Sequence, residues 1–131
     1  MDDKLAVMRA FQADYMAGNA ERACRAHLSD DFQLHEPPEL PQGGVFTGWD
    51  APMRVSAIYM AIWDIDLLEA AFFDVPGADL VVSRYLMKWT HKGTGKTMTQ
   101  PIAELNTVAG GKIRRMEVFH FDAAGLLATT R

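Results

Sequence analysis

The chain has 131 residues, 49% of them hydrophobic, with a formal net charge of −4 and a pI near 5.5. This length and apolar fraction predict one domain, residues 1–131, with a substantial core. The acidic balance argues against a nucleic-acid partner, because nucleic acids are normally bound by a basic surface. With no leader pattern at the start and no apolar run as long as ~18 residues, we expect a cytoplasmic protein without a membrane partner.

Residue types that often carry chemistry do not form familiar patterns here. Cys24 is the single cysteine, so no disulfide can form within the chain, and we expect a buried thiol on a helix. The four histidines show no His-x-x-x-His or Glu-x-x-His spacing, and neither a Gly-x-Ser-x-Gly elbow nor a phosphate loop occurs. We therefore expect no metal ion and no cofactor.

Helical spacing of apolar residues predicts three helices in the first half of the chain. Residues that can cap or end these helices are Asp2, Asp3, Gly18, Asn19 and Asp50. Pro52 fits the first turn of the third helix, where a missing N–H costs little. This third segment is apolar almost all round as far as Trp63, so we expect it to be covered on more than one side.

Strand patterns occupy much of the remaining chain. Residues 32–38 predict a short strand that follows a break at residues 29–31 and stops at two prolines, which cannot donate to a ladder. Residues 37–48, with three prolines and three glycines, predict a loop. Four long strands joined by short turns, and then a tail from residue 126, are predicted at residues 65–75, 80–91, 97–108 and 112–121.

This order of elements indicates the fold class. Consecutive strands with short turns form an antiparallel meander, and the helices must cover one of its faces. We predict an α+β fold, in which a twisted, mostly antiparallel, cone-shaped sheet is wrapped by three N-terminal helices. The open end of such a cone is a natural pocket for a small molecule.

His35 and Glu36 stand at the end of the first predicted strand, at the mouth of an apolar region. Because side chains alternate along a strand, the two point to opposite faces and do not form a dyad. Glu36 is the leading candidate for chemistry. The alternative is a strand-end carboxylate that faces solvent.

Several stretches together resemble the SnoaL-like, or NTF2-like, superfamily, which includes ketosteroid isomerases, limonene epoxide hydrolases and polyketide cyclases. They are residues 17–19, 29–37, 95–97, 101–102, 111–113, 118–122 and 126–127. The second stretch resembles the isomerases' run of two aspartates, a strand and an acid-proline pair. The resemblance spans nearly the whole chain and implies the cone fold, although this fold hosts many unrelated functions.

The resemblance places the isomerases' general base on Glu36, where desolvation would raise the pKa of a carboxyl group. The isomerases' two oxyanion donors fall on Phe11 and Ala103, neither of which can donate a hydrogen bond. Because one such donor can be worth roughly 3 kcal/mol of barrier, efficient ketosteroid isomerisation is not expected.

The other two reactions of the superfamily are matched less well. The epoxide hydrolases' Asp-Arg-Asp set falls near Met87, near Tyr85 and at Val118 or Phe119, and Arg84 is one step out of phase. The polyketide cyclases' acid/base residue on the last strand has only Glu117 or His120 as replacements.

Strand alternation extends the comparison to the rest of the pocket. If Ala103 faces the pocket, then Thr99, Pro101 and Leu105 do so too, and Glu104 faces away, toward a dimer partner. Of the last strand, Met116, Val118 and His120 are expected to face the pocket. The candidates for an acid/base partner of Glu36 are His120 and Tyr85, and Tyr85 is also a possible replacement for the missing oxyanion donor. Candidate ligand contacts, whose aromatic members can equally be core, are Phe11, Tyr15, His35, Trp49, Tyr59, Trp63, Met87, Trp89, Ala103, Met116 and Val118.

Two functional hypotheses remain. The first is an enzyme that uses general acid/base proton transfer on an apolar cyclic or carbonyl substrate, without a cofactor. The alternative is a non-catalytic module of the same fold that binds an apolar ligand or dimerises. A homodimer through the sheet face is compatible with both.

Overall fold

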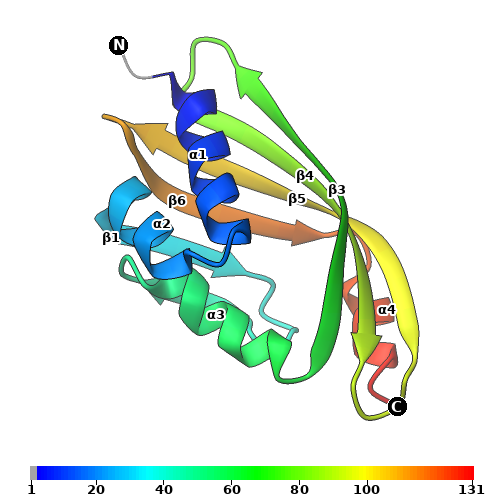
Figure 1. The fold of residues 1–131 in the computed structure, drawn as a ribbon. Helices are drawn as coiled ribbons and strands as arrows, with labels where there is room; N and C mark the ends of the chain where they lie inside the picture. Colours follow the sequence, from blue (N-terminus) through cyan, green and yellow to red (C-terminus); the bar gives the residue numbers. More distant parts are fainter. Residues whose placement is uncertain (1–2) are drawn as a thin grey trace.

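The computed structural model describes residues 3–131 (Figure 1). The elements are, in order, α1 (Lys4–Met16), α2 (Ala20–His27), β1 (Leu28–Glu36), β2 (Gly44–Thr47), α3 (Ala51–Met60), β3 (Trp63–Val75), β4 (Leu80–His91), β5 (Thr97–Ala109), β6 (Lys112–His120) and α4 (Ala123–Ala128). The strands form one sheet in the order β2-β1-β6-β5-β4-β3. The β1–β6 pair is parallel, and the other neighbouring pairs are antiparallel.

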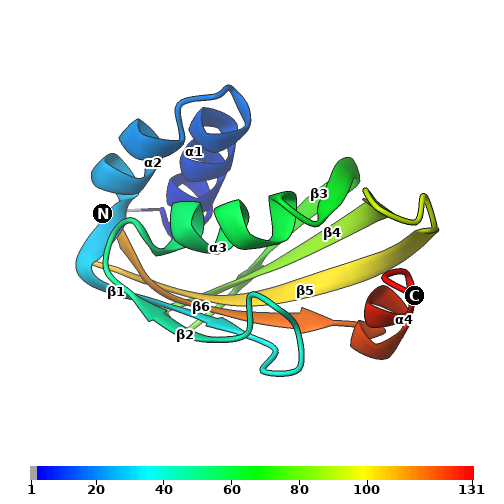
Figure 2. The same cartoon turned by 90° about the horizontal axis from the view of Figure 1, so that it is seen from below.

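The sheet is curved, and α1, α2 and α3 all lie on its concave face (Figure 2). This arrangement confirms the predicted α+β fold with three helices wrapped over a twisted, mostly antiparallel sheet. The side chain of Cys24 on α2 is buried, as expected. Burial raises the pKa of its thiol to about 11, so the thiol stays protonated at neutral pH.

The helix ends follow the predicted caps only in part. Asp3 caps α1 by accepting a hydrogen bond from the Leu5 N–H at 3.0 Å, whereas Asp2 lies outside the described residues. Within the described residues, Asn19 and Asp50 occupy N-cap positions without a side-chain capping bond. Asp50 fails to cap because its carboxylate binds Arg54 Nε at 3.2 Å instead. Helix α3 ends at Met60, earlier than predicted.

Two elements were missed in the segments predicted as loop and tail. Within 37–48, β2 pairs antiparallel with β1, and its start at Gly44 has a φ of +110°, a conformation that glycine adopts without strain. In the tail, Asp122 accepts from the Gly125 N–H at 2.8 Å and so caps α4. Both elements are too short to show a clear period in the sequence.

Two strands begin earlier than predicted, so additional residues at their starts belong to the sheet. β1 starts at Leu28 rather than after the expected break at residues 29–31, and β3 starts at Trp63. The Trp63 indole N–H donates to Thr129 Oγ1 at 2.9 Å, which ties the start of β3 to the residue after α4. Trp63 is therefore a core residue.

Candidate active site

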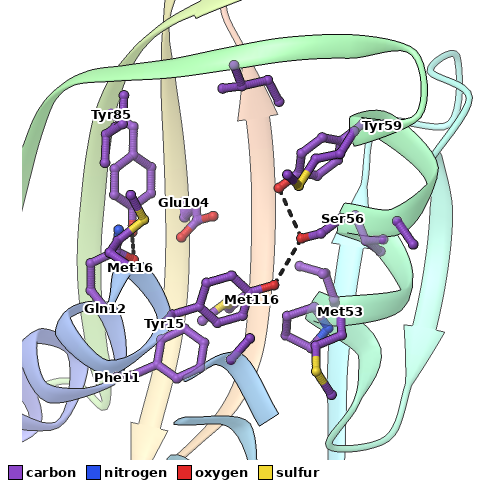
Figure 3. A pocket seen from close by; sticks show the side chains of 18 of the residues that line it. Phe11, Gln12, Tyr15, Met16, Met53, Ser56, Tyr59, Tyr85, Glu104 and Met116 are labelled. Atoms are coloured by element: carbon purple, nitrogen blue, oxygen red, sulfur yellow. Dashed lines mark hydrogen bonds between the residues drawn. The ribbon is translucent and has the colours of Figure 1, made fainter. Parts of the chain in front are cut away.

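A cavity of about 640 Å³ lies between the concave sheet face and helices α1 and α3 (Figure 3). Its wall is mostly apolar and includes Phe11, Tyr15, Met16, Leu34, Met53, Val55, Tyr59, Met60, Ile65, Leu67, Met87 and Met116. The polar groups that reach it come from Gln12, Glu36, Ser56, Tyr85 and Glu104. An apolar cavity with a few convergent polar groups is typical of a small-molecule site.

The register of the sheet decides which residues of β5 face this cavity. Ser83 pairs with Glu104, and Glu104 pairs with Val118, so all three point to the concave face. Ala103 pairs with Arg84 and Phe119 on the convex face. The predicted phase of β5 was therefore wrong by one residue.

That shift corrects five predictions together. Ala103, Thr99, Pro101 and Leu105 face away from the cavity, and Glu104 lines it. Sequence periodicity could not decide the phase, because apolar residues occur on both faces of β5. The cavity consequently contains a second carboxyl group that the sequence analysis had placed at a dimer surface.

Glu36 is the last residue of β1, and its side chain is mostly buried at the cavity wall. Burial raises the pKa of Glu36 to about 8, and the nearby charge of Glu104 adds to the rise. The buried amide of Gln42 favours the ionised form and opposes the rise, although within residues 3–131 it forms no regular hydrogen bond. At neutral pH the Glu36 carboxyl therefore holds its proton.

Glu104 reaches the same cavity from the middle of β5, where Figure 3 shows its carboxyl facing the interior. Burial raises the pKa of Glu104 to about 7, and the neighbouring Tyr85 hydroxyl opposes this rise. Because Glu104 has the lower pKa of the two, Glu104 ionises first. Between about pH 7 and pH 8 the main state of the pair is therefore one carboxylic acid, Glu36, and one carboxylate, Glu104.

His120 lies behind Glu36, with its Nε2 atom 3.9 Å from Glu36 Oε1 and its side chain almost fully buried. Burial lowers the pKa of His120 to about 4, so the imidazole is neutral and forms no ion pair with Glu36. Its Nδ1 atom lies 3.3 Å from Gln100 Nε2. The ring also packs against Trp89, at a centroid distance of 5.7 Å.

Three hydroxyl groups form a short chain on the helical side of the cavity. The Ser56 hydroxyl is 3.0 Å from the Tyr15 hydroxyl and 3.1 Å from the Tyr59 hydroxyl (Figure 3). Burial raises the pKa of Tyr59 to about 12 and also raises the pKa of Tyr15, so the chain stays neutral. Three O–H donors make two internal hydrogen bonds, which leaves one donor for a ligand oxygen.

Of the residues predicted from the sequence, seven line the cavity: Phe11, Tyr15, Glu36, Tyr59, Tyr85, Met87 and Met116. The Tyr85 hydroxyl donates to Gln12 Oε1 at 3.4 Å. His120 and Val118 are on the concave face, as expected, but they are buried behind the cavity wall.

Four other predicted contacts lie away from the cavity. His35 is on the opposite face of β1 from Glu36 and contacts Gln33 Oε1 at 3.1 Å. Trp49 packs under the Arg25 guanidinium at 3.8 Å. Trp63 and Trp89 stack edge to face in the core, at a centroid distance of 5.7 Å. These aromatic residues are packing residues, the alternative that the sequence left open.

Four polar residues of this region were not predicted from the sequence: Gln12, Gln42, Ser56 and Gln100. A polar residue within an apolar pattern is a weak signal for each, and it is clearest for Ser56 in the mostly apolar third helix. Within residues 3–131, no group of three His, Cys, Asp or Glu side chains is arranged to hold a metal ion. None of the described helices is both long and apolar enough to cross a membrane.

No family model and no curated protein matches this chain. Solved structures do match it over nearly its full length. An NTF2-like protein from Burkholderia thailandensis is 21% identical, with 100% of this chain and 99% of that chain covered and a TM-score of 0.83. TerC, crystallised with polyporic acid, is 18% identical, with 98% of each chain covered and a TM-score of 0.79.

A third match is a proposed polyketide cyclase from Xanthomonas campestris, which is 15% identical, with 98% of this chain and 96% of that chain covered and a TM-score of 0.76. At these identities the likeness concerns the fold. The chain has the NTF2-like fold that its sequence resemblance implied.

Proposed function

We propose that this protein is a small-molecule enzyme that moves protons by general acid/base catalysis on an apolar cyclic or carbonyl substrate. The observation that carries the proposal is the pair of carboxyl groups, Glu36 and Glu104, in one apolar cavity. Burial raises the pKa of these groups to about 8 and about 7, values close to a physiological working pH. Two carboxyls whose environments separate an acid from a base are a recurring catalytic arrangement.

The proposal assigns different roles to the two groups. The Glu104 carboxylate removes a proton from the carbon next to the substrate carbonyl, and the Glu36 carboxylic acid gives its proton to the carbonyl oxygen. The product of this step is an enol. In the reverse step, Glu104 gives its proton to the same or another carbon, and Glu36 takes the proton back from the enol oxygen. Glu36 thus acts as the acid at neutral pH, which revises the role of base that its sequence position implied.

The remaining cavity groups suit such a substrate. A volume of about 640 Å³ accommodates a compact ring system. The chain of hydroxyls from Tyr15, Ser56 and Tyr59 offers one neutral donor to a second ligand oxygen. TerC was crystallised with polyporic acid, and the Xanthomonas protein is a proposed polyketide cyclase, so small organic ligands occur elsewhere on this fold.

The test is proton–deuteron exchange on a panel of apolar cyclic ketones in D2O, followed by NMR of the α-protons. We compare the native protein with Glu36→Gln and Glu104→Gln, and use Glu117→Gln as the matched control. Glu117 pairs with Arg115 on the convex face at 3.4 Å. Each cavity variant should slow exchange at least 100-fold, and the control should not. Exchange that continues in both cavity variants contradicts the proposal.

The alternative is a binding module that holds an apolar ligand without turning it over. The observation in its favour is Phe11, which occupies a cavity position but cannot serve as an oxyanion donor. This alternative predicts ligand line-broadening without exchange, unchanged in both carboxyl variants. In either case we propose a homodimer through the convex sheet face, where Phe73 and Phe119 are about half exposed.

A further inference from the structure

We propose that Gln100 is a positioning residue, which fixes His120 as the tautomer protonated on Nε2 and directs that N–H toward Glu36. This inference rests on the proposed function only for the role that the positioning would serve, because Gln100 and His120 lie behind the acid/base pair and not in the cavity. The tautomer of His120 can be measured without any substrate. The two proposals therefore fail separately.

The first step is the orientation of the Gln100 side chain. Gln100 is on β5 and is 2% exposed. Its Oε1 atom accepts a hydrogen bond from the backbone N–H of Asp122 at 2.7 Å, just beyond the end of β6. Since a backbone N–H can only donate, the amide oxygen must face Asp122, and the amide nitrogen must face the other way.

The second step is the protonation of the imidazole. The Gln100 Nε2 atom is 3.3 Å from His120 Nδ1. An amide nitrogen can only donate, so Nδ1 must be the acceptor and carries no proton. A neutral imidazole then holds its proton on Nε2, the nitrogen that faces Glu36.

The third step is the orientation of the ring. A ring turned by 180° would place carbon atoms against both Gln100 and Glu36, and both polar contacts would be lost. The orientation in the structure instead places a nitrogen at each contact, 3.3 Å from Gln100 and 3.9 Å from Glu36. The tilted face of Trp89 holds the ring in this plane.

This chain of contacts limits what His120 can do. The distance of 3.9 Å is too long for a direct hydrogen bond, but it places the Nε2–H group next to the carboxyl of Glu36. The amide of Gln100 cannot accept a proton, so the chain ends there and cannot relay one from Glu36. His120 is thus a fixed donor behind the site and not the acid or base that the sequence suggested.

The experiment is a long-range 1H–15N NMR correlation on protein labelled with 15N-histidine, which reports which ring nitrogen carries the proton. The signals of His120 are assigned by their loss in His120→Asn. The native protein should show a pure Nε2–H pattern for His120 at pH 7. A pure Nδ1–H pattern, or an exchange-averaged mixture, overturns the proposal.

A variant tests the role of Gln100 itself. Gln100→Met keeps the length of the side chain but removes the donor to Nδ1, so the pattern of His120 should shift toward a mixture of tautomers and its pKa should rise. Gln100→Leu is a second variant with the same expectation. Gln33→Leu is the matched control, because Gln33 contacts His35 on the opposite face and should alter only the signals of His35. If the tautomer pattern of His120 is unchanged in a folded Gln100 variant, the role of Gln100 is contradicted. The spectrum of the native protein tests the tautomer of His120 separately.

Discussion

Burial is the main cause of the raised pKa of each cavity carboxyl, and the charge of Glu104 is a secondary cause for Glu36 alone. Desolvation disfavours the ionised form of any buried carboxyl group. A second carboxyl with a different pKa is needed so that one group can be the acid while the other is the base. The placement of Glu104 on the wrong face of its strand was therefore the decisive error in the prediction from sequence. Glu36 could be identified because an acid followed by proline marks the end of a strand.

At the same scale, the Ser56 hydroxyl can be tested against a second serine. Ser56→Ala removes two hydrogen bonds, to Tyr15 and Tyr59, and should lower the free energy of unfolding by about 1–2 kcal/mol. Ser29→Ala is the control, because the buried Ser29 hydroxyl has no hydrogen-bond partner within residues 3–131. Its loss should be neutral or stabilising. Urea unfolding of both variants checks the contrast, which a larger loss for Ser29→Ala would refute.

At the scale of elements, the loop between β1 and β2 folds tightly beside Glu36. It is closed by hydrogen bonds from the Leu40 N–H to Pro37 O at 3.1 Å and from the Gly43 N–H to Leu40 O at 2.8 Å. A Cβ atom on Gly43 would lie 2.3 Å from Pro37 O and 2.8 Å from Leu40 O. Only glycine permits this close approach of backbone to backbone.

Gly43→Ala should accordingly destabilise the protein by about 1–3 kcal/mol, because rigid backbone atoms must move. Gly93→Ala is the matched control. A Cβ atom there would approach the His91 ring, at 3.0 Å, so a side chain and not the backbone has to shift, and by only a few tenths of an ångström. Thermal unfolding of the two variants gives the comparison. Equal melting temperatures would show that the loop is not constrained in this way.

How much the sequence predicted depended on the length of each element. The three N-terminal helices and the four long strands could be recognised because their periods extend over many residues. The short elements β2 and α4 could not, since pairing with β1 and the cap at Asp122 define them. On β5 both faces carry apolar residues, so the sequence pattern could not decide whether Ala103 or Glu104 faces the cavity. The residues of β4 and β6 that pair with them decide it.

At the scale of the whole molecule, the raised pKa values predict how stability changes with pH. A folded-state pKa above the unfolded value means that the folded state binds more protons, so the free energy of unfolding falls as pH rises through that interval. The lowered pKa of His120 acts in the opposite direction, but only between about 4 and 6.5. Above that range the carboxyl pair dominates.

The native protein should therefore lose on the order of 2 kcal/mol of unfolding free energy between about pH 6.5 and pH 8. Glu36→Gln cannot ionise, so its loss over the same interval should be less than half as large. Urea unfolding at several pH values measures both slopes. A native protein whose stability stays constant or increases over this interval would contradict the raised pKa values.

The convex face of the sheet gives a prediction about assembly. Phe119 on this face is 51% exposed, and Phe121, beyond the end of β6, is 81% exposed. We expect a dimer by size-exclusion chromatography with light scattering, and a monomer for Phe119→Asp. Met16→Asp, which alters a residue on α1 with a similar exposure, is the control and should remain dimeric. A native monomer at micromolar concentration would rule out this interface.

A pH titration followed by NMR of 13C-labelled glutamate carboxyls tests directly whether Glu36 and Glu104 form a coupled pair in the cavity. Glu36 and Glu104 are assigned from their glutamine variants. We predict that both titrate near neutral pH, and that Glu104→Gln lowers the pKa of Glu36 because one source of repulsion is lost. Two midpoints at about 4.3, the ordinary pKa of glutamate, would show that the two carboxyls are neither buried nor coupled in this way.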